Sequence, residues 1–317
     1  MTAPASAQFP AETSADGAFV RQRYTIRDRI TADGASGFRA EPGRYHLYVS
    51  LACPWAHRAV IVRRLLGLED VISMSVVDPV RDERGWAFRE GRGHGPDPVC
   101  AFQFLSEAYL RTDPSYTGRY TVPCVWDRAT GRLVTNNYPD ITIDLETQFA
   151  AFHAPGAPDL YPEPLRAEID EVAELVYRDV NNGVYRAGFA TSQAAYERAV
   201  HALFARLDWL EDRLATRRYL VGGRLTEADV RLFTTLARFD AVYVGHFKCN
   251  LRRLVDYPAL WAYARDLYQH PAFGPTVDFD HIKRHYYTTH DQLNPSRIVP
   301  AGPLVDWDAP HDRARLP

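Results

Sequence analysis

The sequence predicts an α/β domain followed by an all-α domain, and two features of its 317 residues indicate this. Between residues 44 and 152, short stretches that alternate apolar and polar residues are separated by stretches with helical spacing. After a proline-rich linker at residues 154–164, apolar residues recur only at the i, i+3, i+4 spacing of amphipathic helices. We therefore expect an N-terminal arm, two domains and a C-terminal tail, with bounds 1–43, 44–152, 160–275 and 276–317.

The elements of the first domain follow the order of a known α/β arrangement. Four stretches are typical of strands, at residues 45–51, 71–78, 120–127 and 131–134. Helical spacing follows the first strand at residues 54–70, where Gly67 is expected to end the helix, and it recurs at residues 140–152. Residues 80–117 are polar, glycine-rich and aromatic, and their pattern is too irregular for a single element. The resulting order, βαβ followed by ββα, is that of a thioredoxin-like domain.

The second domain is expected to be helical throughout. Its predicted helices lie at residues 164–188, 192–216, 225–239 and 257–270. Thr226 opens the third of these helices and Asp229 follows three positions later, which is a capping pair. From residue 276 the tail shows no regular pattern and is expected to be irregular.

The composition excludes several classes of protein. The 37 basic and 40 acidic residues are mixed along the chain and give a net charge of −3, so no nucleic-acid partner is expected. No apolar run approaches about 18 residues, so no membrane span is expected. No secretory signal is found, which favours a cytoplasmic location with reduced thiols. The four cysteines form no CxxC pair and match no zinc motif, so neither a disulfide framework nor a bound metal is expected.

Cys53 is the first candidate for chemistry. The first strand ends near Leu51, and Pro54 suits the first position of a helix, so Cys53 would be the N-cap. A thiol there faces backbone N–H groups and the positive end of the helix dipole, which favour the reactive thiolate. Ala56 stands where a second thiol would complete a CxxC motif, so any disulfide must form with an external thiol. The alternative is a buried cysteine that acts as a small apolar residue.

The segment TVPCV, residues 121–125, is the second candidate. In thioredoxin-like folds a cis-proline lies beside the active cysteine, and here it would be Pro123. The backbone of Val122 would then pair with a thiol substrate as a neighbouring strand does. The alternative is an ordinary proline on an edge strand. Cys124 is expected to point into the core.

Several longer motifs resemble those of the glutathionyl-hydroquinone reductases, also called the xi class, within the glutathione transferase superfamily. The motifs run from residue 46 to residue 303, which is nearly the whole chain. They are CPWAHR, GWAF, GRYTVPCVWD, GVYRAGFATSQAAYERAV, GHFKCNLRRLVDYPALW and HYYTTHDQLNPSRIVPAGP. The resemblance implies a glutathione transferase-like fold and the reduction of a hydroquinone that is joined to a thiol by a thioether bond.

The resemblance also implies roles for individual residues. Cys53 would be the nucleophile that attacks the sulfur of the substrate and forms a mixed disulfide, which a second thiol molecule then reduces. The thiol would be held by Trp86, Arg119, Val122 and Pro123. The hydroquinone pocket would be lined by tyrosines, whose rings and hydroxyl groups suit a flat ring with hydroxyl groups: Tyr185, Tyr286 and Tyr287. The alternative for the aromatic residues is packing, and for Arg119 an ion pair.

Two residues depart from the family pattern. Most members have a glutamate and a serine that hold the γ-glutamyl group of glutathione, and Asn137 and Tyr138 stand at those positions here. Loss of such a charged contact costs on the order of 1.5–3 kcal/mol. The thiol co-substrate is therefore expected to be either glutathione or mycothiol, whose acetylated cysteine and sugar present no such ammonium group. Asn137 and Tyr138 are also expected to bind the thiol, by hydrogen bonds to the sugar hydroxyl groups if it is mycothiol. If it is glutathione, Asp140 or a shifted loop would supply the missing carboxylate.

The sequence is also compatible with two other functions. A general thiol transferase, disulfide reductase or dehalogenase of the same superfamily would use the same Cys53. A non-catalytic binding protein with this fold would carry an unreactive Cys53. The resemblance implies a homodimer that acts on small molecules. It assigns neither the hydroquinone nor a role for Cys100, Cys124 or Cys249.

Overall fold

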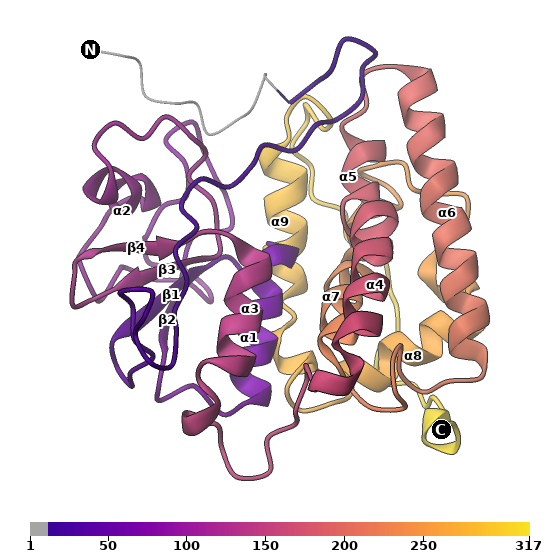
Figure 1. Ribbon diagram of the computed structural model, residues 1–317. Coiled ribbons are helices and arrows are strands. Elements are labelled where there is room, and N and C mark those ends of the chain that lie inside the picture. The colour runs from indigo at the N-terminus through magenta and orange to yellow at the C-terminus, as the bar shows by residue number, and fades with distance from the viewer. Residues whose placement is uncertain (1–11) are drawn as a thin grey trace. The chain divides into compact units, whose positions relative to one another are not determined.

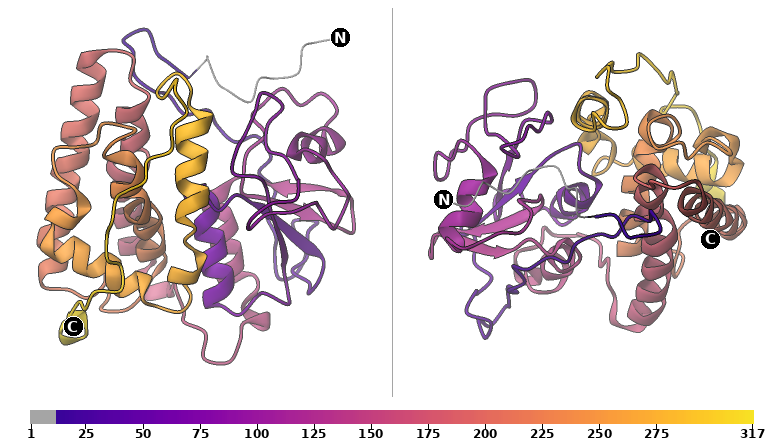
Figure 2. Two further views of the ribbon diagram at one scale, coloured as in Figure 1. Left: turned by 180° about the vertical axis from the view of Figure 1, so that it is seen from behind. Right: turned by 90° about the horizontal axis from the view of Figure 1, so that it is seen from above.

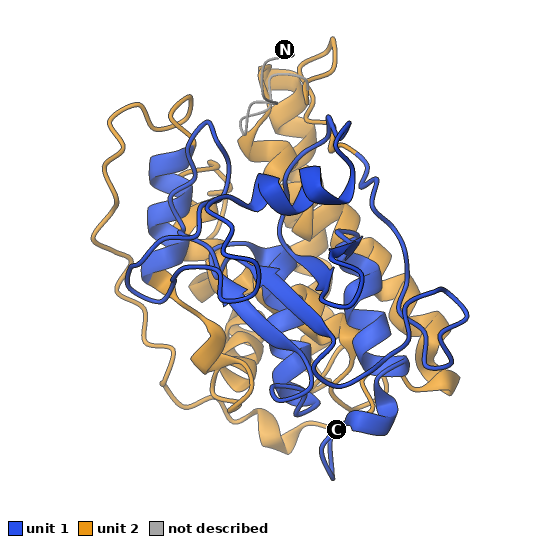
Figure 3. Cartoon of the chain, turned by 90° about the vertical axis from the view of Figure 1, so that its left-hand side faces the viewer, with its two compact units in different colours: residues 1–9, 23–158, 280–289 blue, residues 10–22, 159–279, 290–317 orange. Residues whose placement is uncertain are grey.

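The computed structural model describes residues 12–317, and the part of the expected N-terminal arm at residues 1–11 lies outside the described residues. The described chain divides into two compact units (Figure 3). Unit 1 consists of residues 23–158 and 280–289, and unit 2 consists of residues 12–22, 159–279 and 290–317. Each unit therefore draws on separate stretches of the chain.

Unit 1 is built on a four-stranded mixed sheet (Figure 1). Its strands are β1 (Tyr45–Val49), β2 (Ser73–Val76), β3 (Cys124–Asp127) and β4 (Arg132–Thr135). They lie in the order β2-β1-β3-β4, with β1 parallel to β2 and antiparallel to β3, and with β3 antiparallel to β4. All five residues of β1 are buried, as expected for a strand with a neighbour on each side. The predicted thioredoxin-like arrangement is confirmed.

Two helices of unit 1 follow the prediction. They are α1 (Pro54–Leu65) and α3 (Tyr138–Thr147), which pack against each other (Figure 1). Gly67 ends the first of them as expected, with a φ of +66° that a residue with a Cβ rarely adopts. A Cβ at this position would also lie 2.4 Å from the Cβ of Ala154, so the close approach of the two segments requires glycine.

Two helices of unit 1 were not predicted, and the expectation of irregular structure at both places is wrong. The helix α2 (Leu105–Thr112) lies within residues 80–117 and has only eight residues, too few for a clear period. The helix α9 (Phe279–Thr289) lies in the tail. Its buried face contains His281, His285 and Tyr286 beside Ile282, so its periodicity is hidden when only apolar residues are counted.

Unit 2 is helical, as predicted (Figures 1 and 2). Its main helices are α4 (Arg166–Val176), α5 (Gly183–Gly188), α6 (Gln193–Ala215), α7 (Glu227–Arg238) and α8 (Pro258–Tyr268). The helix α6 packs against α5 and α8, and α7 packs against α4. The single helix expected at residues 164–188 is divided by a π-helical turn, Tyr177–Asn181, which separates α4 from α5.

The predicted capping pair opens α7. The Asp229 carboxylate accepts hydrogen bonds from the Thr226 backbone N–H, at 2.8 Å, and from the Tyr263 hydroxyl, also at 2.8 Å. Burial raises the pKa of Asp229 to about 6, and these donors oppose that rise. No helix among residues 12–317 is long and apolar enough to cross a membrane.

Candidate active site

Cys53 lies at the N-terminus of α1, directly after the turn that follows β1. It is the N-cap residue, with extended backbone angles (φ −79°, ψ 120°), and Pro54 occupies the first helical position. The Cys53 thiol is 3.4 Å from the carbonyl oxygen of Val122, to which it donates. The peptide bond between Val122 and Pro123 is cis, as expected from the TVPCV motif. The structure therefore brings together Cys53 and the backbone segment predicted to bind a thiol.

The other three cysteines have surroundings that disfavour a thiolate. Burial raises the pKa of the Cys124 thiol and of the Cys249 thiol well above the ordinary value, and both side chains are fully buried. Burial also raises the pKa of Cys100. Cys53 differs in its position, because it is the N-cap residue of α1 and so lies at the positive end of the helix dipole. Cys53 is thus the thiol whose position best suits a nucleophile.

Trp86 lies in the loop between β2 and α2, and its indole is only 4% exposed. It stacks on the imidazole of His285, with the ring centroids 4.9 Å apart and the planes at 24°. The guanidinium of Arg81 lies 5.4 Å from the centroid of the same indole. The backbone around Trp86 is also fixed, because the Leu105 N–H donates to the Trp86 carbonyl at 2.9 Å.

Arg119 lies just before β3 and is half-buried. Two phenols hold the backbone of this segment. The Tyr116 hydroxyl donates to the Arg119 carbonyl at 2.9 Å, and the Tyr109 hydroxyl donates to the Thr121 carbonyl at 2.7 Å. These contacts fix the backbone of residues 119–121, which directly precede Val122 in the chain.

Asn137 and Tyr138 form the start of α3. Asn137 is the N-cap residue, is 7% exposed, and donates through Nδ2 to the Asp140 carboxylate at 2.5 Å. The Tyr138 ring is 3% exposed and lies 4.6 Å from the Trp55 ring, with the Arg58 guanidinium over both rings. The phenol ring of Tyr138 is therefore packed against α1.

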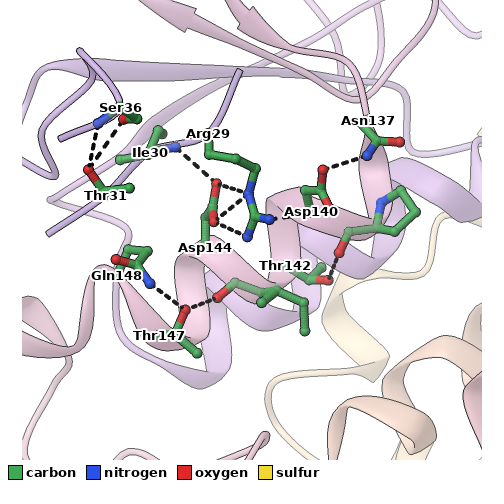
Figure 4. A network of polar contacts seen from close by, with 12 residues as sticks. Arg29, Ile30, Thr31, Ser36, Asn137, Asp140, Thr142, Asp144, Thr147 and Gln148 are labelled. Atoms are coloured by element: carbon green, nitrogen blue, oxygen red, sulfur yellow. Dashed lines mark hydrogen bonds and ion pairs between the residues drawn. The ribbon is translucent and has the colours of Figure 1, made fainter. Parts of the chain in front are cut away.

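Arg29 connects the segment before β1 to α3 (Figure 4). Its Nε donates to the Asp144 carboxylate at 2.9 Å, and the Ile30 N–H donates to the same group at 3.1 Å. Arg29 Nη1 also lies 3.6 Å from the Asp140 carboxylate. The Asp140 carboxylate, which could have replaced the missing glutamate, therefore already has a cation and an amide donor beside it.

The three predicted pocket tyrosines lie on two helices. Tyr286 and Tyr287 lie on α9 in unit 1, and Tyr286 is buried. Tyr185 lies on α5 in unit 2. Its ring packs against Phe247, with centroids 5.4 Å apart, and the Arg21 guanidinium lies 4.8 Å from its centroid.

Several residues that contact predicted site residues, or the alternative acid Asp140, were not identified in the sequence. They include Arg21, Arg29 and His285. His285 directly precedes Tyr286 in the HYY motif, so its place beside a predicted site residue was visible. Arg21 and Arg29 lie in the N-terminal arm, and nothing in their local sequence indicates what they contact. Among residues 12–317 no group of three or more histidine, cysteine, aspartate or glutamate side chains is placed to hold a metal ion.

The sequence of this chain is similar to those of known protein families and of characterised relatives. The model of the glutathione S-transferase N-terminal domain matches residues 52–148, and that of the glutathione S-transferase C-terminal domain matches residues 193–266. The chain is 49% identical over 307 residues to the glutathionyl-hydroquinone reductase YqjG of Escherichia coli, and the matched region covers 95% of this chain and 93% of YqjG. It is 50% identical over 291 residues to the glutathionyl-hydroquinone reductase PcpF of Sphingobium chlorophenolicum, and the matched region covers 92% of this chain and 91% of PcpF.

Solved structures agree with the sequence comparisons. The crystal structure of the xi glutathione transferase of Phanerochaete chrysosporium matches with a TM-score of 0.93 and 47% identity, over 97% of this chain and 100% of that one. The glutathione-bound structure of YqjG matches with a TM-score of 0.89 and 49% identity, over 92% of this chain and 96% of that one.

Proposed function

The chain belongs to the xi class of glutathione transferases, the class of the glutathionyl-hydroquinone reductases, and we propose that it reduces thioether conjugates between a small thiol and a hydroquinone. The observation that carries this proposal is the position of Cys53 at the N-terminus of α1, with its thiol 3.4 Å from the Val122 carbonyl and beside cis-Pro123. The first domain, residues 44–152, would bind the thiol.

The reaction has two steps, and each one makes and breaks a single bond at sulfur. In the first step the Cys53 thiolate attacks the sulfur of the thioether, and the bond between that sulfur and the ring carbon breaks. The electron pair of the broken bond goes to the ring carbon, which takes up a proton and leaves as the free hydroquinone. In the second step a thiolate from solution attacks the mixed disulfide on Cys53. The attacking thiol and the thiol that was bound to Cys53 leave together as a disulfide, and the Cys53 thiolate is regenerated.

Residues of unit 1 would hold the thiol part of the substrate. Trp86, whose indole is stacked on His285, would contact the thiol through the small part of its ring that stays exposed, and Arg119 would pair with a carboxylate or a similar anionic group. Val122 would bond to the thiol through its backbone, in the manner of an added strand. The phenols of Tyr286 and Tyr287, which lie together on α9, would donate to the ring oxygens of the hydroquinone and so stabilise the negative charge that develops as the ring leaves.

We propose mycothiol in preference to glutathione as the thiol, because of the surroundings of Asn137. At this position the family glutamate would hold the ammonium group of glutathione, whereas Asn137 is neutral. The carboxylate of Asp140 accepts from Asn137 at 2.5 Å and lies 3.6 Å from Arg29, so an ammonium group would have to compete with both. A thiol without a free ammonium group avoids that competition. The proposal also includes a cytoplasmic homodimer, as the family resemblance implies.

Steady-state kinetics with S-glutathionyl- and S-mycothionyl-hydroquinone, each with its own thiol as reductant, test the proposal. The expected result is release of the hydroquinone from both conjugates, with the higher kcat/KM for the mycothiol conjugate. The Cys53→Ser variant should lose about a thousandfold or more in kcat. Cys100→Ser is the matched control, because it removes a thiol of the same unit whose pKa burial raises, and it should keep the wild-type rate.

Two outcomes would favour the other functions. Faster exchange with a small mixed disulfide than with either thioether would indicate a general thiol transferase. A wild-type protein that reduces no conjugate, although Cys53 is in its thiol form, would indicate a binding protein.

A further inference from the structure

The loop that carries Trp86 is attached to α9 by a hydrogen bond from His285. The ring nitrogen Nδ1 of His285 lies 2.8 Å from the carbonyl oxygen of Pro79, at the start of this loop. A carbonyl oxygen can only accept a hydrogen bond, so Nδ1 must carry the proton and donate. His285 is 8% exposed, so little water competes for this bond.

The same imidazole also supports the indole of Trp86 directly. The two rings are stacked, with centroids 4.9 Å apart and planes at 24°. One turn earlier on α9, His281 Nε2 donates to the carbonyl of Arg92 at 2.6 Å, near the middle of the loop. The helix therefore binds the loop at two points on either side of Trp86, at Pro79 and at Arg92, and also contacts the Trp86 indole.

We propose that His285 is a positioning residue, which sets the place of the Trp86 indole for the incoming thiol. This inference rests on the proposed function, in which Trp86 contacts the thiol. Tyr286 is the next residue on α9, so the helix joins the loop of the thiol site to a tyrosine of the hydroquinone pocket. The loop that contacts the thiol and the helix that contacts the hydroquinone would then be linked through the side chain of His285.

Three substitutions separate the two contacts of His285. His285→Asn keeps an N–H donor close to the position of Nδ1 and removes the ring. His285→Phe keeps a ring that can stack on Trp86 and removes the donor. His285→Ala removes both. The control is Thr288→Ala on the same helix, because the Thr288 hydroxyl donates only to the Arg284 carbonyl of α9 among the hydrogen bonds described for it.

Kinetics should show a change in binding and not in the chemical step. The Asn and Phe variants should each raise the KM for the thiol conjugate about threefold, and the Ala variant about tenfold, with kcat within about twofold of wild type. The Thr288→Ala control should match wild type. A kcat that falls while KM stays constant would overturn the inference, and so would an unchanged KM in His285→Ala.

Hydrogen exchange gives a second test that does not depend on activity. The backbone N–H groups of residues 80–94 should exchange faster in His285→Ala than in wild type, and His285→Asn should restore most of the protection. If the wild-type protein reduces no conjugate, the proposed function fails, and this exchange experiment still decides whether His285 holds the loop. Equal exchange in wild type and His285→Ala would overturn the positioning role.

Discussion

Replacing Asn137 with glutamate, the residue that the family resemblance implies at this position, should by itself fail to create a good glutathione site. The Asn137 side chain donates to the Asp140 carboxylate at 2.5 Å, so a glutamate would place a second carboxylate within about 4 Å of it. At an effective dielectric constant of about 20, that repulsion is on the order of 4 kcal/mol. Arg29, 3.6 Å from Asp140, offsets part of it. We expect Asn137→Glu to lower the free energy of unfolding by about 2 kcal/mol.

The repulsion disappears when Asp140 is neutralised as well. In the double variant Asn137→Glu/Asp140→Asn, the new amide can donate to the new carboxylate, so the pair is restored with its roles exchanged. The free glutamate charge should then lower the KM for the glutathione conjugate about tenfold relative to wild type, which corresponds to a charged contact of about 1.5 kcal/mol. The KM for the mycothiol conjugate should not fall.

A double-mutant cycle provides the assay. Chemical denaturation and the KM for both conjugates are measured in wild type, Asn137→Glu, Asp140→Asn and the double variant. The Asp140→Asn variant is the control for loss of the Arg29 contact alone. The reasoning is refuted if Asn137→Glu keeps the wild-type stability and gains the full glutathione affinity on its own, because Asp140 would then not oppose a charge at position 137.

Three further predictions concern stability and are measured by denaturation. Asp144→Ala removes the acceptor of Arg29 and of the Ile30 N–H, and it should cost about 2 kcal/mol because Arg29 is partly exposed and regains water; an unchanged midpoint would contradict this. Gly188→Ala would place a Cβ 2.2 Å from the Phe247 ring and should cost about 1–3 kcal/mol. Burial lowers the pKa of His246 from 6.5 to about 4, so the unfolded state binds the proton first as the pH falls. The free energy of unfolding should decrease between pH 6.5 and 4, by up to about 3 kcal/mol, and His246→Gln should lack this component.

Much of the fold was predictable because its elements have strong local signals. The stretch of residues 45–51 was predicted as a strand and contains β1, and the capping pair Thr226 and Asp229 marks the start of α7. Cys53 was identifiable for the same reason, since proline directly after it fixes the first turn of α1. In these cases the local chemistry and the final structure agree.

The elements that the sequence did not reveal are stabilised by contacts that are distant along the chain. The helix α9 buries histidine and tyrosine, and its His285 donates to Pro79, which is 206 positions away. The network of Arg29 with Asp144 spans 115 positions. A local pattern does not encode which distant groups a side chain will meet, so the partners of Asp140 and Trp86 became visible only in the structure.

Single-turnover mass spectrometry on Cys53 tests the central claim most directly. The reduced protein is mixed with one equivalent of S-mycothionyl- or S-glutathionyl-hydroquinone and no free thiol. The masses of the intact protein and of its proteolytic peptides are then measured. We expect the mass of one thiol to be added at Cys53, in step with release of free hydroquinone, and no adduct on Cys53→Ser. Transfer of the hydroquinone ring to Cys53, or release of hydroquinone without an adduct on Cys53, would contradict attack at sulfur by this residue.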